Sequence, residues 1–140
     1  AYRQASNNFN LIKDLTMSAF LGIIPTPGPI QPQARVYDLK ARLDWGEPAL
    51  TIVDVRDRQA FNACHITGAV SIPLDNLVTQ SSSNFEVDRD IYIYGETDDE
   101  TAIAATTLRD AGYTHVSELR GGLAAWKAVS YPVEVTTPAA

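Results

Sequence analysis

The chain has 140 residues and a mass of 15.3 kDa, which is the size of one ordinary domain. Hydrophobic residues make up 45% and charged residues 20%, a composition that excludes general disorder and predicts a soluble globular domain. Asp and Glu number 17 against 11 Lys and Arg, giving a formal net charge of −6. This balance argues against nucleic acid and against an anionic membrane as partners.

The single cysteine, Cys64, excludes an intramolecular disulfide and any paired-cysteine zinc or redox motif. We therefore expect neither a bound metal nor a cofactor. The longest apolar run, residues 19–24, ends at Pro25 and is far too short to cross a bilayer. No secretory signal is legible, so we expect a cytoplasmic protein.

Residues 1–34 differ in pattern from the rest of the chain. Apolar residues three and four apart predict an amphipathic helix over about residues 8–21. The prolines between Pro25 and Pro32 then predict an extended strap, because a helix cannot continue through them. Two roles remain open for this helix: packing on the domain, or docking a protein partner or a second copy of the chain.

Helical and strand patterns alternate from Val36 onward. Helices are expected at residues 37–45, 57–63, 75–78, 99–111 and 123–128. Strands are expected at residues 50–55, 69–72, 91–94 and 115–119, with residues 80–84 as a loop. This alternation predicts an α/β domain over residues 35–134, built on a parallel sheet with helices on both faces and followed by a tail of residues 135–140.

In a parallel sheet of this kind, ligands bind beyond the carboxyl ends of the strands. Two turns qualify best: the one that follows residues 91–94, and the one around Arg120, Gly121 and Gly122. The first is the preferred place for chemistry.

Two sets of motifs resemble the opening and closing halves of a rhodanese-like domain, of the rhodanese and phosphatase superfamily. The first set is Ile-Val-Asp-Val-Arg at 52–56, His-Ile-Thr-Gly-Ala-Val at 65–70 and Ile-Pro-Leu at 72–74. The second is Ala-Gly-Tyr at 111–113 and Gly-Gly-Leu-Ala-Ala-Trp at 121–126. The match covers about residues 36–133. The resemblance implies a five-stranded parallel sheet flanked by helices.

Enzymes of this family carry sulfur on a cysteine placed directly after the strand that matches residues 91–94. Here that position is Gly95, and the family's usual basic positions are Glu96 and Glu100. The loop reads Gly95, Glu96, Thr97, Asp98, Asp99, Glu100, Thr101. Its carboxylates should repel a persulfide or thiosulfate. The resemblance therefore implies an inactive sulfurtransferase homologue, and the phosphatase relatives, which need a cysteine and an arginine in this loop, are excluded in the same way.

Three roles are open for the acids of this loop. Thr97 and Glu100 have the spacing of a capping box, and Asp98 and Asp99 would favour the dipole of the helix that follows. Alternatively, the acids hold a divalent cation or recognise a basic segment of a protein partner.

Cys64 is followed by His65, and two roles are open for it: an inert, partly buried thiol, or a relocated sulfur carrier or redox-sensitive site. By resemblance, position 64 is normally a glycine with a left-handed backbone, so a cysteine is either strained or leaves the helix differently. The sequence thus predicts a non-catalytic binding, assembly or regulatory module. A sulfurtransferase or sulfur carrier using Cys64 is the alternative.

Arg56 is too polar to be buried unpaired, so we expect it to have a carboxylate or carbonyl partner. Family members usually offer a glutamate four residues later, but Ala60 stands there in this chain. Simple strand alternation is taken to place Asp54 and Arg56 on opposite faces.

Overall fold

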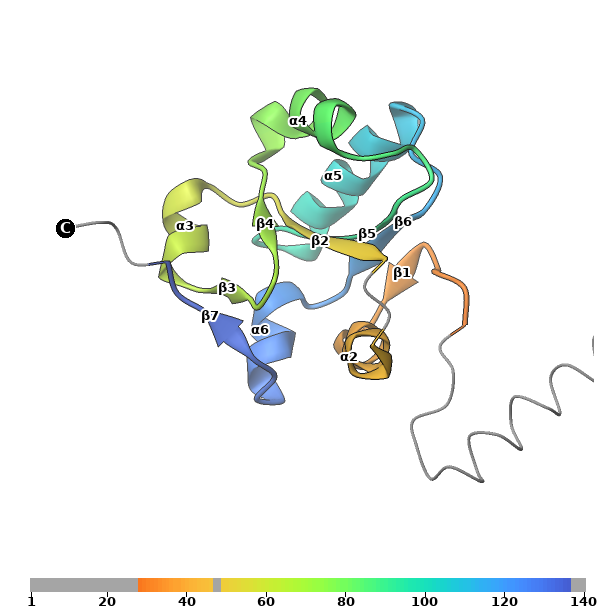
Figure 1. The fold of residues 1–140 in the computed structure, drawn as a ribbon. Helices are drawn as coiled ribbons and strands as arrows, with labels where there is room; N and C mark the ends of the chain where they lie inside the picture. Colours follow the sequence, from red (N-terminus) through yellow and green to blue (C-terminus); the bar gives the residue numbers. More distant parts are fainter. Residues whose placement is uncertain (1–27, 47–48, 137–140) are drawn as a thin grey trace, which may run out of the picture.

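The structure, a computed structural model, describes residues 28–46 and 49–136 (Figure 1). Five parallel strands form the central sheet in the order β1-β6-β5-β2-β4. They are β1 (Gln33–Ala34), β2 (Leu50–Asp54), β4 (Val70–Ser71), β5 (Asp90–Tyr94) and β6 (Val116–Leu119). The predicted parallel α/β architecture, and the five strands that the resemblance implied, are confirmed.

Helices cover both faces of this sheet, as Figure 1 shows for α4 and α5 on one side and α2 and α6 on the other. They are α2 (Val36–Trp45), α3 (Arg58–Ala63), α4 (Leu77–Asn84), α5 (Asp98–Asp110) and α6 (Gly122–Ala128), with a 3₁₀ turn at Leu74–Asn76. None of the described helices is long and apolar enough to cross a membrane.

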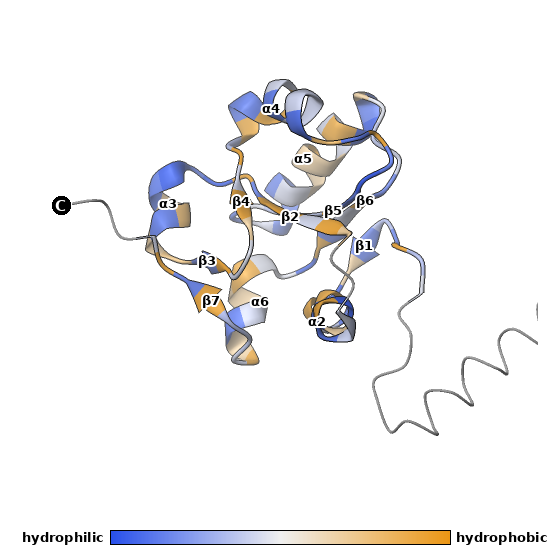
Figure 2. Cartoon of the chain, viewed as in Figure 1, coloured by the Kyte–Doolittle hydropathy of each residue, from blue (hydrophilic) through white to orange (hydrophobic). Residues whose placement is uncertain are grey.

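The central strand β5 shows why both faces need a cover. Ile91 and Ile93 are buried in one apolar cluster, and Tyr92 and Tyr94 are buried in the other. Successive side chains of a strand point to opposite faces, so a continuous apolar run is buried only between two layers. Figure 2 shows hydrophobic residues on the strands in the middle of the molecule, with hydrophilic residues prominent on the outlying α3.

The prediction of a loop at residues 80–84 is wrong, because these residues form the second half of α4. Leu77 and Ser81, one turn apart, are fully buried, and Leu77 belongs to the apolar cluster under α5. The hydroxyl groups of Ser82 and Ser83 donate hydrogen bonds to the carbonyl of Thr79 within the same helix. Packing of the buried side thus overrides the weak helix propensity of a serine run.

Strand β1 lies within the first 34 residues, which the sequence pattern had set apart from the domain. Gln33 and Ala34 pair with Glu118 and Leu119 of β6, so the sheet begins before the predicted boundary. The helix predicted over residues 8–21 lies outside the described residues.

A second, two-stranded antiparallel sheet joins β3 (His65–Ile66) to β7 (Val133–Glu134). No local sequence pattern predicts this small sheet. It fixes the chain after α6 beside the end of α3.

Candidate functional site

The loop that follows β5 contacts the turn between β6 and α6 at the carboxyl edge of the sheet. One carboxylate oxygen of Asp98 accepts the N–H of Gly121 at 2.9 Å, and the other lies 3.3 Å from Nη2 of Arg120. A Cβ placed on Gly122 would lie 3.5 Å from the carbonyl oxygen of Gly95. The two turns that the sequence singled out therefore meet at one place.

Residues 95–101, here called the site loop, are held by their own hydroxyl groups. The N–H of Gly95 donates to Oγ1 of Thr101 at 2.8 Å, and that hydroxyl donates to the carbonyl of Thr97 at 2.9 Å. Oγ1 of Thr97 accepts the N–H of Glu100 at 3.1 Å, which makes Thr97 the N-cap of α5. The structure thus forms the Thr97 half of the predicted capping box.

The side chain of Glu100 lies where a side chain at position 95 would lie. A Cβ placed on Gly95 would be 3.0 Å from Cγ, 3.1 Å from Cδ and 3.2 Å from Oε1 of Glu100. Gly95 is buried and Glu100 is half-buried, so this contact closes the inner side of the site loop.

The four acids of the site loop have different surroundings. Asp98 accepts the N–H of Gly121, and the Glu100 side chain lies beside Gly95. Glu96 and Asp99 are exposed. Within the described part of the chain, no three His, Cys, Asp or Glu side chains converge as metal ligands.

A shallow cavity of about 190 Å³ opens beside the site loop. It is lined by Arg56, Gly95, Glu96, Gly121, Leu123, Ala124 and Lys127. Two cations line it: Arg56, which is buried just after β2, and Lys127, which is exposed on α6.

Arg56 is buried, and its guanidinium is bound to a carboxylate and to a backbone carbonyl. Its Nη2 lies 2.7 Å from Oδ2 of Asp54 and donates to the carbonyl of Cys64 at 2.6 Å. The expected carboxylate or carbonyl partner is therefore confirmed. The placement of Asp54 and Arg56 on opposite faces is wrong, because residues two apart along an extended chain point to the same side.

Burial alone would lower the pKa of Arg56, but the hydrogen bond and the charge of Asp54 outweigh it and raise the pKa above its ordinary value. The guanidinium is thus permanently charged, and Asp54 is its counter-ion. Arg56 supports the wall of the cavity with a group that is already paired.

Cys64 lies outside the site loop, at the end of α3, and is partly exposed. Its backbone is extended, with φ −171° and ψ 135°, so the cysteine leaves the helix without a left-handed residue. The adjacent His65 is buried, with Nδ1 2.7 Å from the carbonyl of Phe61 and Nε2 3.3 Å from the Glu134 carboxylate. The two ring nitrogens of His65 are therefore turned to groups other than the thiol.

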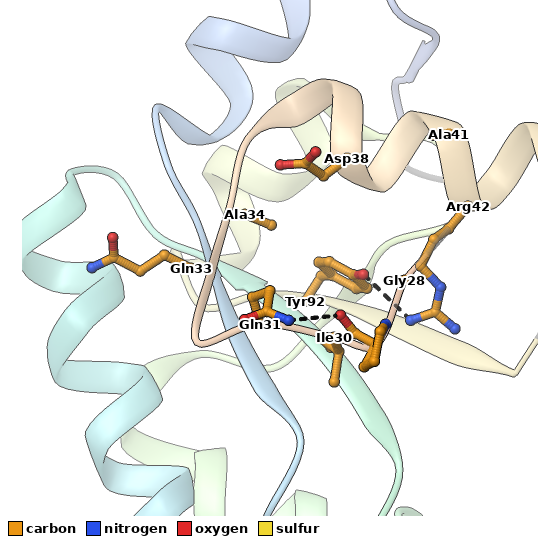
Figure 3. A pocket seen from close by; sticks show the side chains of 10 residues that line it. Gly28, Ile30, Gln31, Gln33, Ala34, Asp38, Ala41, Arg42 and Tyr92 are labelled. Carbon is orange, nitrogen blue, oxygen red and sulfur yellow. Dashed lines mark hydrogen bonds between the residues drawn. The ribbon is translucent and has the colours of Figure 1, made fainter. Parts of the chain in front are cut away.

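A larger cavity, of about 290 Å³, lies between α2 and residues 28–34 (Figure 3). Nη1 of the buried Arg42 is 2.8 Å from the Asp90 carboxylate and donates to the hydroxyl of Tyr92 at 3.3 Å. Burial raises the pKa of Tyr92, although the hydrogen bond from Arg42 acts against it. This cluster was not among the predicted site residues. Its only signal in the sequence is a cation, Arg42, on the side of α2 that also carries the buried Leu39.

The comparisons with known proteins agree with this fold. The family model for the rhodanese-like domain matches residues 36–129. The uncharacterised protein YqhL of Bacillus subtilis is 36% identical over 75 residues, covering 54% of this chain and 59% of its own length. The HTH-type transcriptional regulator Rv0324 of Mycobacterium tuberculosis is 34% identical over 103 residues, covering 72% of this chain and 44% of that protein. The chain thus spans about half the length of these curated relatives.

Solved structures give the same result. The solution structure of the rhodanese-like domain of the Alr3790 protein from Anabaena has a TM-score of 0.73 and 52% identity, covering 79% of this chain and 87% of that one. The thiosulfate sulfurtransferase from Pseudomonas aeruginosa has a TM-score of 0.70 and 26% identity, covering 76% of this chain and 20% of that one. The family model covers more than half of the chain, and the solved structures share its fold. The chain therefore belongs to the rhodanese-like domain family.

Proposed function

We propose that this rhodanese-like domain is a non-catalytic module that binds another protein and does not transfer sulfur. The observation that carries the proposal is Gly95, with Glu100 packed against it, at the end of β5. The resemblance puts the sulfur-carrying cysteine at this position, and a thiolate is the nucleophile that such chemistry requires. The site loop contains no thiol, and its hydroxyls, those of Thr97 and Thr101, are hydrogen-bonded within the loop.

The charges around the cavity support the same proposal. A like charge about 4 Å from an anion costs on the order of 4 kcal/mol at an effective dielectric constant near 20, before screening by solvent. Glu96 and Glu100 would both act on an anion placed at Gly95. Of the two cations that line the cavity, Arg56 is already paired with Asp54. The site loop is therefore unfavourable for thiosulfate or a persulfide.

A protein partner with a basic segment fits the outer side of the site loop, where Glu96 and Asp99 are exposed. The amphipathic helix predicted over residues 8–21 is a second surface through which a partner or another copy of the chain would be bound. The relative Rv0324 carries the name of a transcriptional regulator, and the matched part is less than half of that protein. A binding role within a larger protein is consistent with that relative.

The absence of sulfur transfer is tested by the mass of the intact protein after incubation with thiosulfate, without reductant. We expect no added sulfur, and no thiocyanate above a buffer blank when cyanide is present. The control is Cys64→Ser. A gain of one sulfur atom that is lost in Cys64→Ser would contradict the proposal and make the chain a sulfur carrier.

The binding role is tested with an oligolysine peptide at low salt. Glu96→Gln with Asp99→Asn should weaken its binding by about two- to thirtyfold, because each of the two exposed ion pairs contributes roughly 0.2–1 kcal/mol. The matched control changes two exposed acids elsewhere, Asp75→Asn with Glu86→Gln. Equal weakening by both pairs would show attraction to the net charge alone and would contradict a role for the site loop.

A further inference from the structure

We infer that Glu100 is a second barrier to thiol chemistry in the site loop, separate from the missing cysteine: its side chain crowds the space that a side chain at position 95 would enter and places a carboxylate beside it. The inference rests on the proposed function and deepens it by naming the residue that closes the site.

The backbone does not require a glycine at position 95. Gly46, Gly68, Gly112, Gly121 and Gly122 have positive φ, whereas Gly95 does not. An ordinary L residue can therefore adopt its conformation. What opposes a side chain at this position is the contact with Glu100.

That contact is shorter than an ordinary one. Carbon atoms pack at about 3.5–4.0 Å, whereas a Cβ at position 95 would lie 3.0 Å from Cγ of Glu100. The N–H of Gly95 is bound to Thr101, which limits how far residue 95 can retreat. A cysteine placed here would require the Glu100 side chain to shift by a few tenths of an ångström.

The charge of Glu100 adds to this crowding. Its Oε1 would lie 3.2 Å from the new Cβ, so a sulfur atom on that carbon would form beside a carboxylate. A neighbouring negative charge disfavours the thiolate and raises the pKa of a thiol. A rise of one unit lowers the thiolate fraction about tenfold, and the reaction rate about threefold after the gain in intrinsic nucleophilicity.

Asp98 binds a backbone donor that lines the neighbouring cavity, the N–H of Gly121. Its carboxylate accepts the N–H of Gly121 at 2.9 Å, so this donor is already bound to an anion of the chain itself. Restoring the cysteine alone should therefore not restore a reactive site.

The test installs a thiol at position 95 in the Cys64→Ser chain and varies its neighbours. Four variants are compared: Gly95→Cys alone, and Gly95→Cys with Glu100→Ala, Glu100→Gln or Asp99→Ala. Asp99→Ala is the matched control, because it removes an exposed acid from the same helical turn, and the three atoms nearest the Gly95 Cβ position all belong to Glu100. The readout is the rate of alkylation by iodoacetamide at pH 7, followed by intact mass.

We expect Glu100→Ala to speed alkylation of the new thiol at least about threefold, and Asp99→Ala to change it less than about twofold. Glu100→Gln, which keeps the volume and removes the charge, should lie between Gly95→Cys alone and the Glu100→Ala variant. Equal rates for Gly95→Cys with and without Glu100→Ala would overturn the inference. So would an acceleration by Asp99→Ala as large as that by Glu100→Ala.

Thiosulfate provides a second readout on the same variants. The thiolate attacks the outer sulfur of thiosulfate, a sulfur–sulfur bond forms on the cysteine, and sulfite leaves with the electron pair of the broken bond. The Glu100→Ala variant should gain one sulfur faster than Gly95→Cys alone.

Three variants without a new thiol serve as controls for effects on stability: Gly95→Ala, Glu100→Ala and the double substitution. Gly95→Ala should lower the melting temperature, and it should lower it less when Glu100 is already alanine. Strictly additive shifts would overturn the steric half of the inference.

The inference and the proposed function can fail separately. Sulfur gained by the natural chain through Cys64 contradicts the proposed function and leaves the comparison at position 95 unaffected. Equal reactivity with and without Glu100 contradicts the inference and leaves the natural site loop without a thiol.

Discussion

Arg56 is locked to the carboxylate of Asp54, two residues earlier, by hydrogen bonds of 2.7, 3.1 and 3.2 Å. Asp54 is fully buried at the end of β2, and Arg56 reaches from it to the carbonyl of Cys64 at the end of α3. One guanidinium thus ties a central strand to the neighbouring helix and supports the wall of the cavity beside the site loop.

Removing this guanidinium should be costly. Arg56→Met should lower the free energy of unfolding by about 3–5 kcal/mol, because it leaves the charge of Asp54 buried without a counter-ion. Urea denaturation measures the effect. Asp54→Asn in the same chain should recover part of the loss, and Arg58→Met, at an exposed position, is the control. A loss below about 1 kcal/mol in Arg56→Met would show that water replaces the guanidinium.

Two glycines with similar backbones should respond differently to alanine. Gly46 has φ +85° with open space around it, whereas Gly121 has φ +78° and its Cβ would lie 2.5 Å from that of Ala125. Gly46→Ala should cost about 1 kcal/mol for the left-handed backbone. Gly121→Ala should cost about 1–3 kcal/mol more, because the collision adds to the strain.

Thermal unfolding of both variants provides the comparison. Ala125→Gly should recover part of the loss in the Gly121→Ala chain and none in the Gly46→Ala chain. Equal losses at the two glycines would mean that α6 shifts freely away from the turn.

The sequence predicts the parts of this fold that are encoded locally. The apolar run at 91–94 and the Thr97 cap predict β5 and the start of α5, and both are found within one residue of the expected place. The two-residue strands have no such signal, because each is defined by a distant partner: Gln33 pairs with Glu118, and His65 with Glu134.

The site is predictable in part for the same reason. The local pattern and the resemblance predict that Gly95 stands at the end of a buried strand. They do not predict that Glu100 lies beside it, because this depends on the direction of one side chain on the first turn of α5, which spacing does not determine. The ion pair of Arg42 with Asp90, 48 positions later, likewise depends on the packing of α2 on the sheet.

Replacing Ser81 with alanine should make the domain more stable. Its hydroxyl is fully buried in α4 and has no hydrogen-bond partner in the described part of the structure. Burial of such a group is unfavourable by about 1–3 kcal/mol, and alanine has the higher helix propensity. Ser81→Ala should therefore raise the free energy of unfolding by about 0.5–1.5 kcal/mol in urea denaturation. Ser82→Ala, which removes an exposed hydroxyl bonded to Thr79, is the control, and a loss of stability in Ser81→Ala would indicate a buried water at this hydroxyl.

Ionisation of the buried Tyr94 should make the domain less stable at alkaline pH. Its side chain is fully buried, and its oxygen accepts the N–H of Ile66 at 3.1 Å. Burial raises the pKa of Tyr94 above its ordinary value near 10, and the charge of Asp54 raises it further. The unfolded chain therefore loses this proton at a lower pH than the folded one.

It follows that the contribution of Tyr94 to the free energy of unfolding is intact below pH 10 and decreases above it, by up to about 1.4 kcal/mol per pH unit. Tyr94→Phe should be less stable than the natural chain at pH 8 by about 1–3 kcal/mol, because the N–H of Ile66 loses its acceptor. The difference between the two proteins should narrow between pH 10 and 11 in urea denaturation. Tyr37→Phe, which removes a hydroxyl from a ring that is 51% exposed, is the control for loss of a tyrosine. A constant difference across this range would mean that Tyr94 ionises as readily in the folded domain as in the unfolded chain.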